Sequence, residues 1–90
     1  MKHSKRIILT WDEWTVEHIK KHNVTITEVR QAFKSRKVIE QSYRGRQSII
    51  GKTRKGRILI IVLSYELQKE GYVVSARDCS KKEREKFQTA

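Results

Sequence analysis

The chain has 90 residues and a formal net charge of +11, with 21 Lys and Arg against 10 Asp and Glu. This length suits one small domain, residues 1–90, and the charge favours nucleic acid, an acidic protein or an anionic membrane surface as partner. The longest apolar run is far shorter than the roughly 20 residues of a spanning helix, and the first residues predict neither a signal peptide nor an anchor. A single cysteine, Cys79, excludes an internal disulfide. We therefore expect a cytoplasmic protein without a membrane partner.

An edge strand at residues 7–9 and two helices are predicted for the first third of the chain. A hydroxyl followed three positions later by a carboxylate forms a capping box, which marks a helix start. The pairs that fit are Thr10 with Glu13 and Thr25 with Glu28. We expect a first helix over about 11–22 and a second over about 26–34, with Asn23 in the left-handed conformation that ends the first.

Helical spacing places several aromatic residues on one side of the first helix. The set is Trp11, Trp14, Thr15 or His18, Ile19 and His22. Trp14 is expected in the core, because it can contact Leu9 as a hydrophobic staple. Trp11 has two interpretations: it packs in the core, or it lies at the surface and stacks on an unpaired base.

From about residue 36 the pattern changes from helix to strand. Residues 37–43 and 47–52 are β-prone on either side of Arg44-Gly45-Arg46, and a turn containing Gly56 follows. The apolar run 58–63 predicts a strand that is buried on both faces at the centre of the sheet.

The last third is expected to hold a turn, a strand and a helix. The turn covers 68–71, and the strand 72–77 alternates its faces. One face would carry Tyr72, Val74 and Ala76, and the other Val73, Ser75 and Arg77. Ser80 with Glu83 caps a helix from Lys81 to about Phe87. The predicted order is β-α-α-β-β-β-β-α, an α+β fold with a curved antiparallel sheet and packed helices.

Two motifs that suggest ligands are set aside. Gly51-Lys52-Thr53 echoes a phosphate-binding loop, but Arg46 stands where that motif needs its first glycine, and a strand follows instead of a helix. His18 and His22 have a spacing that can hold zinc, yet no further ligand cluster accompanies them. We expect no metal and no cofactor. A structural role for His22 at the helix C-terminus is favoured, with a catalytic or RNA-contacting role second.

Arg46, Arg57 and Arg77 border strands, so their side chains start from a rigid sheet. Cleavage of RNA through its 2′-hydroxyl needs a base, a cation for the developing charge and a donor for the leaving oxygen. Arginine suits the second task, because its pKa lies far above neutrality. His22, Lys52 and Lys86 are the candidates for proton transfer. A solvated surface that only attracts an acidic partner explains the basic residues equally well.

Several short segments, in this order, resemble the BrnT toxins of bacterial type II toxin-antitoxin modules. They are Trp11-Asp12-Glu13, Lys21-His22-Asn23-Val24, Arg46 before Ile50-Gly51-Lys52-Thr53, Gly56-Arg57, and Ser75-Ala76-Arg77 leading into Ser80-Lys81-Lys82-Glu83-Arg84. The resemblance spans nearly the whole chain. It departs from the family pattern at Asn23, where glycine is usual, and at Phe87, which lacks the hydroxyl of the usual tyrosine.

The resemblance implies a RelE-like fold and metal-independent cleavage of RNA that halts translation. It also implies a cognate antitoxin with a ribbon-helix-helix domain, so that DNA is contacted only indirectly, through the antitoxin complex. The family pattern singles out Trp11, His22, Arg46, Arg57 and Arg77.

The sequence therefore predicts an endoribonuclease toxin with an arginine clamp on the scissile phosphate. The expected catalytic residues are Arg46, Arg57, Arg77 and His22. The expected RNA-binding residues are Trp11, Arg44, Lys52, Arg54 and Lys55. The alternatives are a non-catalytic module of the same fold that binds nucleic acid or antitoxin, and a domain that binds only an acidic protein.

Overall fold

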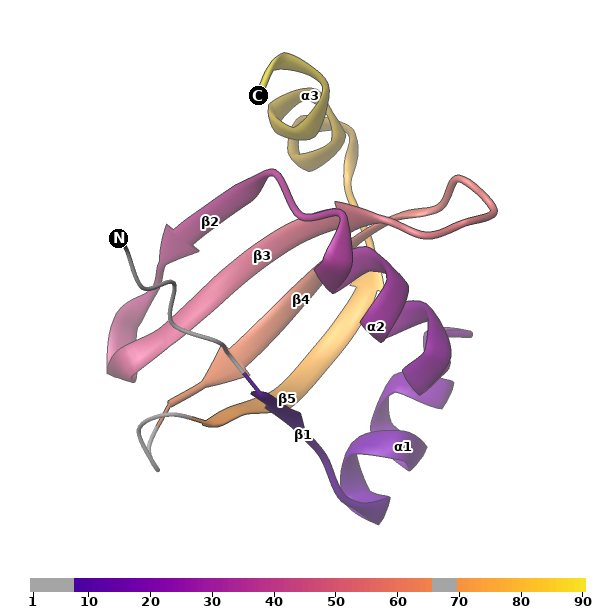
Figure 1. Cartoon of the computed structure of the whole chain (residues 1–90), viewed down its shortest axis with the longest axis vertical. Helices are drawn as coiled ribbons and strands as arrows, with labels where there is room; N and C mark the ends of the chain where they lie inside the picture. Colours follow the sequence, from indigo (N-terminus) through magenta and orange to yellow (C-terminus); the bar gives the residue numbers. More distant parts are fainter. Residues whose placement is uncertain (1–7, 66–69) are drawn as a thin grey trace, which may run out of the picture.

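The computed structural model describes residues 8–65 and 70–90. In chain order the elements are β1 (Ile8–Thr10), α1 (Glu13–Lys20), α2 (Ile26–Lys34), β2 (Val38–Gln41), the single 3-10 turn η1 (Tyr43–Gly45), β3 (Arg46–Lys52), β4 (Ile58–Ser64), β5 (Glu70–Asp78) and α3 (Lys81–Thr89). The predicted α+β class and the β-α-α-β-β-β-β-α order are confirmed (Figure 1). Residue 7 of the predicted edge strand and residues 68–69 of the predicted turn lie outside the described residues.

The five strands form one sheet in the order β1-β5-β4-β3-β2. β4 lies at the centre, as its continuous apolar sequence predicts, and the pairs from β5 to β2 are antiparallel. β1 is the expected edge strand, but it joins β5 in parallel. The connection through α1 and α2 carries the chain from β1 to β2 at the opposite edge, and the sheet then builds back through β3 and β4 until β5 lies beside β1.

Each face of the sheet has its own hydrophobic cluster. On one face α1 and α2 pack on the larger cluster, which includes Ile19, Val29, Ile49 and Ile61. On the other face α3 packs through Phe87 on a smaller cluster with Ile50, Ile60 and Cys79. Figure 1 shows α3 set apart at one end of the sheet, while α1 and α2 lie together. The two faces therefore offer different surroundings to the side chains that leave the sheet.

Close contact between α2 and β3 depends on Gly51. A Cβ atom at this position would overlap the backbone carbonyl of Ala32 in α2. Two polar side chains then join α2 to the β3–β4 hairpin. The Ser35 hydroxyl donates to the Lys52 carbonyl at 2.6 Å and accepts from the Lys52 N–H at 2.9 Å, and the Gln31 amide oxygen accepts from the Arg54 N–H at 3.1 Å. The hairpin is thus held against α2.

Helix α1 starts two residues later than its sequence predicts. The N-cap is Asp12, which forms a capping box with Thr15, and the pair Thr10 with Glu13 is not used. The buried Thr15 hydroxyl also donates to the Val73 carbonyl of β5 at 3.1 Å. Because Thr15 and Ile19 face the sheet, Trp14 is turned outward and is 56% exposed. The prediction that Trp14 is a core residue is wrong.

Strand β5 does not alternate as predicted. The register changes between Val62 and Leu63, where a β-bulge places an extra residue in β5. Val73 and Ala76 therefore lie in the same core cluster, although strict alternation assigns them to opposite faces.

The predictions for the other two helices are confirmed. Helix α2 spans 26–34 with the Thr25–Glu28 capping box, and Ser80 with Glu83 caps α3. Asn23 has φ 59, the left-handed conformation expected of it.

Candidate nucleic-acid interface

The three sheet arginines do not converge. Side chains alternate along β3, so Arg46 shares the face of Ile50, on which α3 packs. Arg77 lies opposite Ile60 and is on that same face. Arg57 precedes β4 and reaches α2 on the other face. The single clamp of three arginines that the sequence predicts is therefore not formed in this structure.

Arg46 and Arg77 share a face but lie apart. Arg77 pairs with Ile60 of β4, which pairs in turn with Ile50 of β3, four residues along from Arg46. At about 3.3 Å per residue and about 4.8 Å per strand, this is about 13 Å along the sheet and about 10 Å across it. The sequence indicates that each arginine borders a strand. The face of the sheet on which its side chain lies, and its distance from the other arginines, depend on how the strands are paired in register.

The Arg57 guanidinium joins three elements. Its Nη1 donates to the Glu28 carboxylate of α2 at 2.9 Å and to the Asn23 carbonyl at 2.7 Å. Its Nε and Nη2 donate to the two oxygens of Asp78 at the end of β5, at 3.2 and 3.0 Å. Since arginine has five N–H donors, most of them are already used. Arg57 holds α2, β4 and β5 together at this end of the sheet.

The pKa values of this network follow from its hydrogen bonds. The bond to Asp78, followed by that to Glu28, raises the pKa of Arg57 above its ordinary value despite partial burial. Partial burial acts to raise the pKa of Glu28, but the Thr25 N–H and Arg57 outweigh it and leave that pKa lowered. Both groups stay charged, so the pair provides no proton donor or acceptor near neutral pH.

Arg77 is paired as well, but nearer to solvent. Its two terminal nitrogens donate to the Glu83 carboxylate at 2.9 and 3.1 Å, and its side chain is 46% exposed. Glu83 is also the acceptor of the α3 capping box. The bond from Arg77 lowers the pKa of Glu83, and the Ser80 N–H adds to this against partial burial. Arg77 would have to leave Glu83, or share it, to hold a phosphate.

His22 lies at the α1–α2 connection, next to the Asn23 carbonyl that Arg57 contacts. It continues an aromatic ladder on the outer side of α1. The Trp14 and His18 rings stack with centroids 4.7 Å apart, and the His22 ring meets His18 edge to face at 5.9 Å. Within the described residues, no three His, Cys, Asp or Glu side chains are grouped to hold a metal.

A hollow of about 1000 Å³ runs beside α2. Its lining comes from β1 and Trp11, from α2 and from the β3–β4 hairpin. The residues are Ile8, Leu9, Trp11, Thr27, Arg30, Gln31, Phe33, Lys34, Ser35, Lys52, Thr53 and Arg54. Three of the predicted RNA-binding residues, Trp11, Lys52 and Arg54, thus meet at one place, and Trp11 is 38% exposed.

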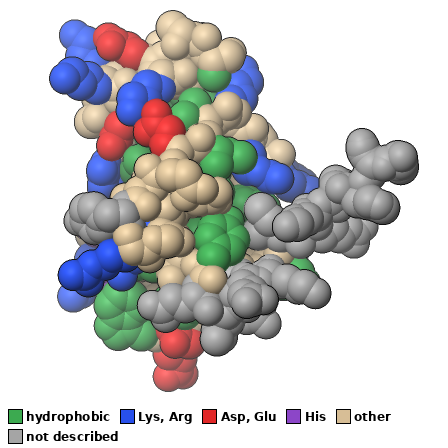
Figure 2. Space-filling model, turned by 90° about the vertical axis from the view of Figure 1, so that its left-hand side faces the viewer, with side chains coloured by type: hydrophobic (Ala, Val, Ile, Leu, Met, Phe, Trp, Pro, Cys, Tyr) green, Lys and Arg blue, Asp and Glu red, His purple; other side chains and the backbone are tan. Residues whose placement is uncertain are grey.

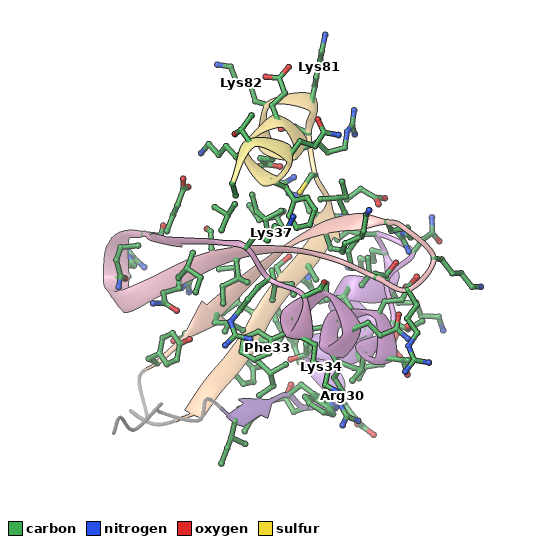
Figure 3. The ribbon with its side chains drawn as sticks, turned by 45° about the horizontal axis from the view of Figure 1, so that its top comes forward. Arg30, Phe33, Lys34, Lys37, Lys81 and Lys82 are labelled. Atoms are coloured by element: carbon green, nitrogen blue, oxygen red, sulfur yellow. The ribbon has the colours of Figure 1, made fainter. Side chains whose placement is uncertain are left out.

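Arg30 and Lys34 of α2 belong to this hollow, and the sequence analysis missed them. They are four residues apart and share one helix face, and Figure 3 shows both on α2 close to β1. This i, i+4 pair of cations opposite the buried Val29, Ala32 and Phe33 is the signal that could have found them.

The remaining predicted cations lie elsewhere. Arg44 is exposed in η1, before β3, with a left-handed φ of 64. Lys55 is exposed at the tip of the hairpin. Lys86 of α3 pairs with Glu40 of β2 at 3.2 Å. Figure 2 shows the end of the molecule that lies at the left of Figure 1, and its basic side chains are scattered among acidic and uncharged ones. The described residues form no compact basic patch at this end.

The structure can be compared with known proteins. It is similar to the 1.1 Å crystal structure of the Brucella abortus ribonuclease toxin BrnT, with a TM-score of 0.65 and 23% sequence identity over 83% of this chain and 97% of that chain. The fold is that of BrnT. No protein-family model and no curated protein matches the sequence. The BrnT-like architecture expected from the short sequence segments is therefore confirmed. No helix of the described residues is long and apolar enough to cross a bilayer.

Proposed function

We propose that this protein is the toxin of a type II toxin-antitoxin pair and that it acts as an endoribonuclease. The observation that carries the proposal is the likeness of its fold to a ribonuclease toxin over 97% of that protein's chain. The net charge of +11 supports a polyanionic substrate. The hollow beside α2 adds a place where cations and an exposed tryptophan lie together.

The proposed reaction uses the 2′-hydroxyl of RNA as nucleophile and needs no metal. Arg46 and Arg77 share the face of α3 but lie apart, so one of them is proposed to stabilise the scissile phosphate and its charge in the transition state, and the other to hold a neighbouring phosphate of the same strand. Arg57 lies on the other face, paired with Glu28 and Asp78, and is proposed to affect cleavage only indirectly, by holding α2, β4 and β5 together. His22 is the proposed proton-transfer group, because an imidazole ring can serve as general acid or general base. Cleavage would stop translation in the cytoplasm.

The proposed partner is a cognate antitoxin with a ribbon-helix-helix domain. DNA would be contacted only through the complex with that antitoxin. Expression of the chain alone should arrest growth, and expression together with the neighbouring reading frame should restore it. Unimpaired growth on expression of the chain alone would contradict the toxin assignment.

Cleavage is tested with purified protein, a 5′-labelled messenger RNA fragment and EDTA. We expect discrete products with 2′,3′-cyclic phosphate ends, and no cleavage where a 2′-deoxy nucleotide replaces the one before the scissile bond. Arg46→Gln, Arg77→Gln and His22→Gln are expected to lower kcat by about 100-fold or more, as loss of an electrostatic or acid-base group does. Lys82→Gln, an exposed cation on α3, is the matched control.

The second candidate is a module of the same fold that binds RNA without cutting it. The ion pairs of Arg57 and Arg77 favour this candidate, because guanidinium groups that already bind carboxylates are not available to stabilise a transition state. Such a protein would leave the labelled RNA intact while its affinity falls steeply with salt. Intact RNA after prolonged incubation of the folded wild-type protein would decide for this candidate.

A further inference from the structure

We propose that the hollow beside α2 is a subsite for single-stranded RNA, in which Arg30 and Lys34 hold phosphates and Trp11 stacks on a base. The subsite rests on the proposed function, since it takes up the RNA on one side of the bond that is cut. It differs from the sheet arginines, which lie near strand ends and of which Arg57 and Arg77 are ion-paired.

The charge of the lining supports an anionic ligand. Four of the twelve lining residues are cations, Arg30, Lys34, Lys52 and Arg54, and none is acidic. Within residues 8–65 and 70–90, the ion pairs involve Arg57, Arg77 and Lys86, and none of these four side chains. Among the described residues, then, no carboxylate forms an ion pair with these four cations. A ligand with several phosphates would compensate their charge.

The apolar side of the hollow favours an unpaired strand over a duplex. Trp11 lies beside Ile8 and Leu9 and is partly exposed. Stacking on an aromatic side chain requires a base whose face is free, which single-stranded RNA offers and an A-form duplex does not. Trp11 together with two helix cations therefore recognises a backbone and a base at once.

The framework of the subsite is fixed before any ligand binds. α2 lies close on β3 at Gly51, and Ser35 and Gln31 bond to the hairpin that carries Lys52 and Arg54. Arg30 and Lys34 project from the same face of this helix. Since the helix and the hairpin do not have to be ordered on binding, the entropic cost of ordering these two elements is avoided.

An acidic protein segment is the other class of ligand that fits the charge. Lysine is depleted at the centre of protein–protein interfaces, however, and two of the four cations of this hollow, Lys34 and Lys52, are lysines. RNA is favoured, because its binding sites combine basic grooves with exposed aromatic rings.

The test uses a fluorescein-labelled 12-nucleotide RNA with 2′-O-methyl groups, which the proposed chemistry cannot cut. Fluorescence anisotropy is measured between 50 and 300 mM salt for the wild type, for the Arg30→Gln/Lys34→Gln double variant and for Trp11→Ala. The control is Lys81→Gln/Lys82→Gln, which removes the same charge from α3, and Figure 3 shows these two lysines far from Arg30 and Lys34. Circular dichroism melts check that each variant folds.

We expect the Arg30/Lys34 double variant to bind about 10-fold more weakly at 100 mM salt. Its log–log salt slope should fall by about 1.4, for two phosphate contacts at about 0.7 each. Trp11→Ala should lose about fivefold or more in affinity with the slope unchanged. The α3 control should stay within about twofold of the wild type, and a 12-base-pair RNA duplex should not distinguish wild type from Trp11→Ala.

Equal losses in the α2 and α3 variants would overturn the subsite, because they would show a general charge effect. Unchanged RNA binding with lost antitoxin binding would overturn it in favour of a protein interface. The proposed nuclease activity is measured separately by cleavage. Intact RNA together with the expected binding losses would reject the nuclease and keep the subsite, whereas cleavage with unchanged binding would do the reverse.

Discussion

Arg57 and Arg77 differ in how firmly they are held. Arg57 is 27% exposed and contacts two carboxylates and a backbone carbonyl from three elements. Arg77 is more exposed, and among the described side chains it pairs with Glu83 alone. A planar fork of donors satisfies a carboxylate with two bonds, which a lysine ammonium cannot reproduce. Replacement of either arginine by lysine keeps the positive charge but removes the two-bond geometry, so it separates the effects of these two properties on stability.

We predict that Arg57→Lys lowers the free energy of unfolding by about 1–2 kcal/mol, because several charged hydrogen bonds in a partly buried site are lost. Arg77→Lys should cost less than about 1 kcal/mol, as is usual for an exposed pair. Urea denaturation at pH 7 measures both. Equal losses would show that Arg57 is no more structural than Arg77. The comparison also tells whether lost cleavage in an Arg57 variant reflects folding.

Cys79 is predicted to react slowly with thiol reagents. Burial, to which the nearby Glu83 adds, raises the pKa of the Cys79 thiol to about 11. Relative to a thiol with the ordinary value of 9.0, about 100-fold less thiolate is present at pH 8, and thiolate is the reactive form. Ellman's reagent should therefore react at least about 100-fold faster in 8 M urea than in buffer. A fast reaction of the folded protein would contradict this placement.

Helix α1 shows what a local signal can and cannot predict. The capping-box pattern found a helix start here, as it did at α2 and α3, but two hydroxyl or carboxylate residues competed for the N-cap. Asp12 forms the cap because Thr15 can then bond to β5, a contact between residues 58 positions apart. Sequence spacing holds no information on that contact. The shift of two residues turned Trp14 from the core to the surface.

The order of the elements along the chain and the central strand were predictable, but the register of β5 was not. The continuous apolar sequence of β4 identified the central strand because only a strand covered on both sides tolerates it. The bulge near Leu63 has no local sequence signal, and it moved Val73 and Ala76 to one face. The same dependence on register explains why three arginines of similar sequence context separated onto two faces.

The contact between α2 and β3 gives a prediction at Gly51. Gly51→Ala is expected to destabilise the protein by about 3 kcal/mol or more, since the new Cβ overlaps the backbone of Ala32 and neither backbone can move without shifting an element. Ser48→Ala, on the opposite face of β3, is the control and should change stability little. Thermal melts of the two variants measure the difference. A wild-type melting temperature for Gly51→Ala would contradict the close packing of α2.

Only part of the candidate site could be predicted, because tertiary contacts bring its residues together. Lys52 and Arg54 were recognised as cations of a hairpin, and Trp11 as a possible stacking platform, each from its own segment. Their common hollow arises from the bonds of Gln31 and Ser35 to that hairpin, which are tertiary. Arg30 and Lys34 complete it. A basic helix face on its own indicates only a solvated surface, so its role emerges from what lies beside it.

At the scale of the whole molecule, acidic residues act as fixed counter-charges in a strongly basic protein. Ten carboxylates stand against 21 Lys and Arg, and two of the carboxylates each cap a helix and pair with an arginine at once. Glu28 does so for α2 with Arg57, and Glu83 for α3 with Arg77. Each therefore links a helix start to the sheet, so that protonation of a few carboxylates affects several elements together.

This arrangement predicts that stability is lost in acid. The pKa values of Asp12, Glu28 and Glu83 are all lowered by hydrogen bonds in the folded state. The unfolded chain, with ordinary values near 4, binds more protons as the pH falls below about 4.5, and stability must then decrease. Each extra proton adds a slope of about 1.4 kcal/mol per pH unit. Protonation also leaves the 21 Lys and Arg unbalanced, which adds repulsion to the folded state.

Urea denaturation at a series of pH values measures this effect. We expect the free energy of unfolding to change little between pH 7 and about pH 5 and to fall steeply below about 4.5. Glu83→Gln keeps a residue that can complete the capping box but removes the charge that Arg77 pairs with, so its curve should be shallower below pH 4.5. Glu85→Gln, an exposed residue of the same helix, is the control and should keep the wild-type slope. Parallel curves for the wild type and Glu83→Gln would show that acid acts through general repulsion and not through the capped ion pairs.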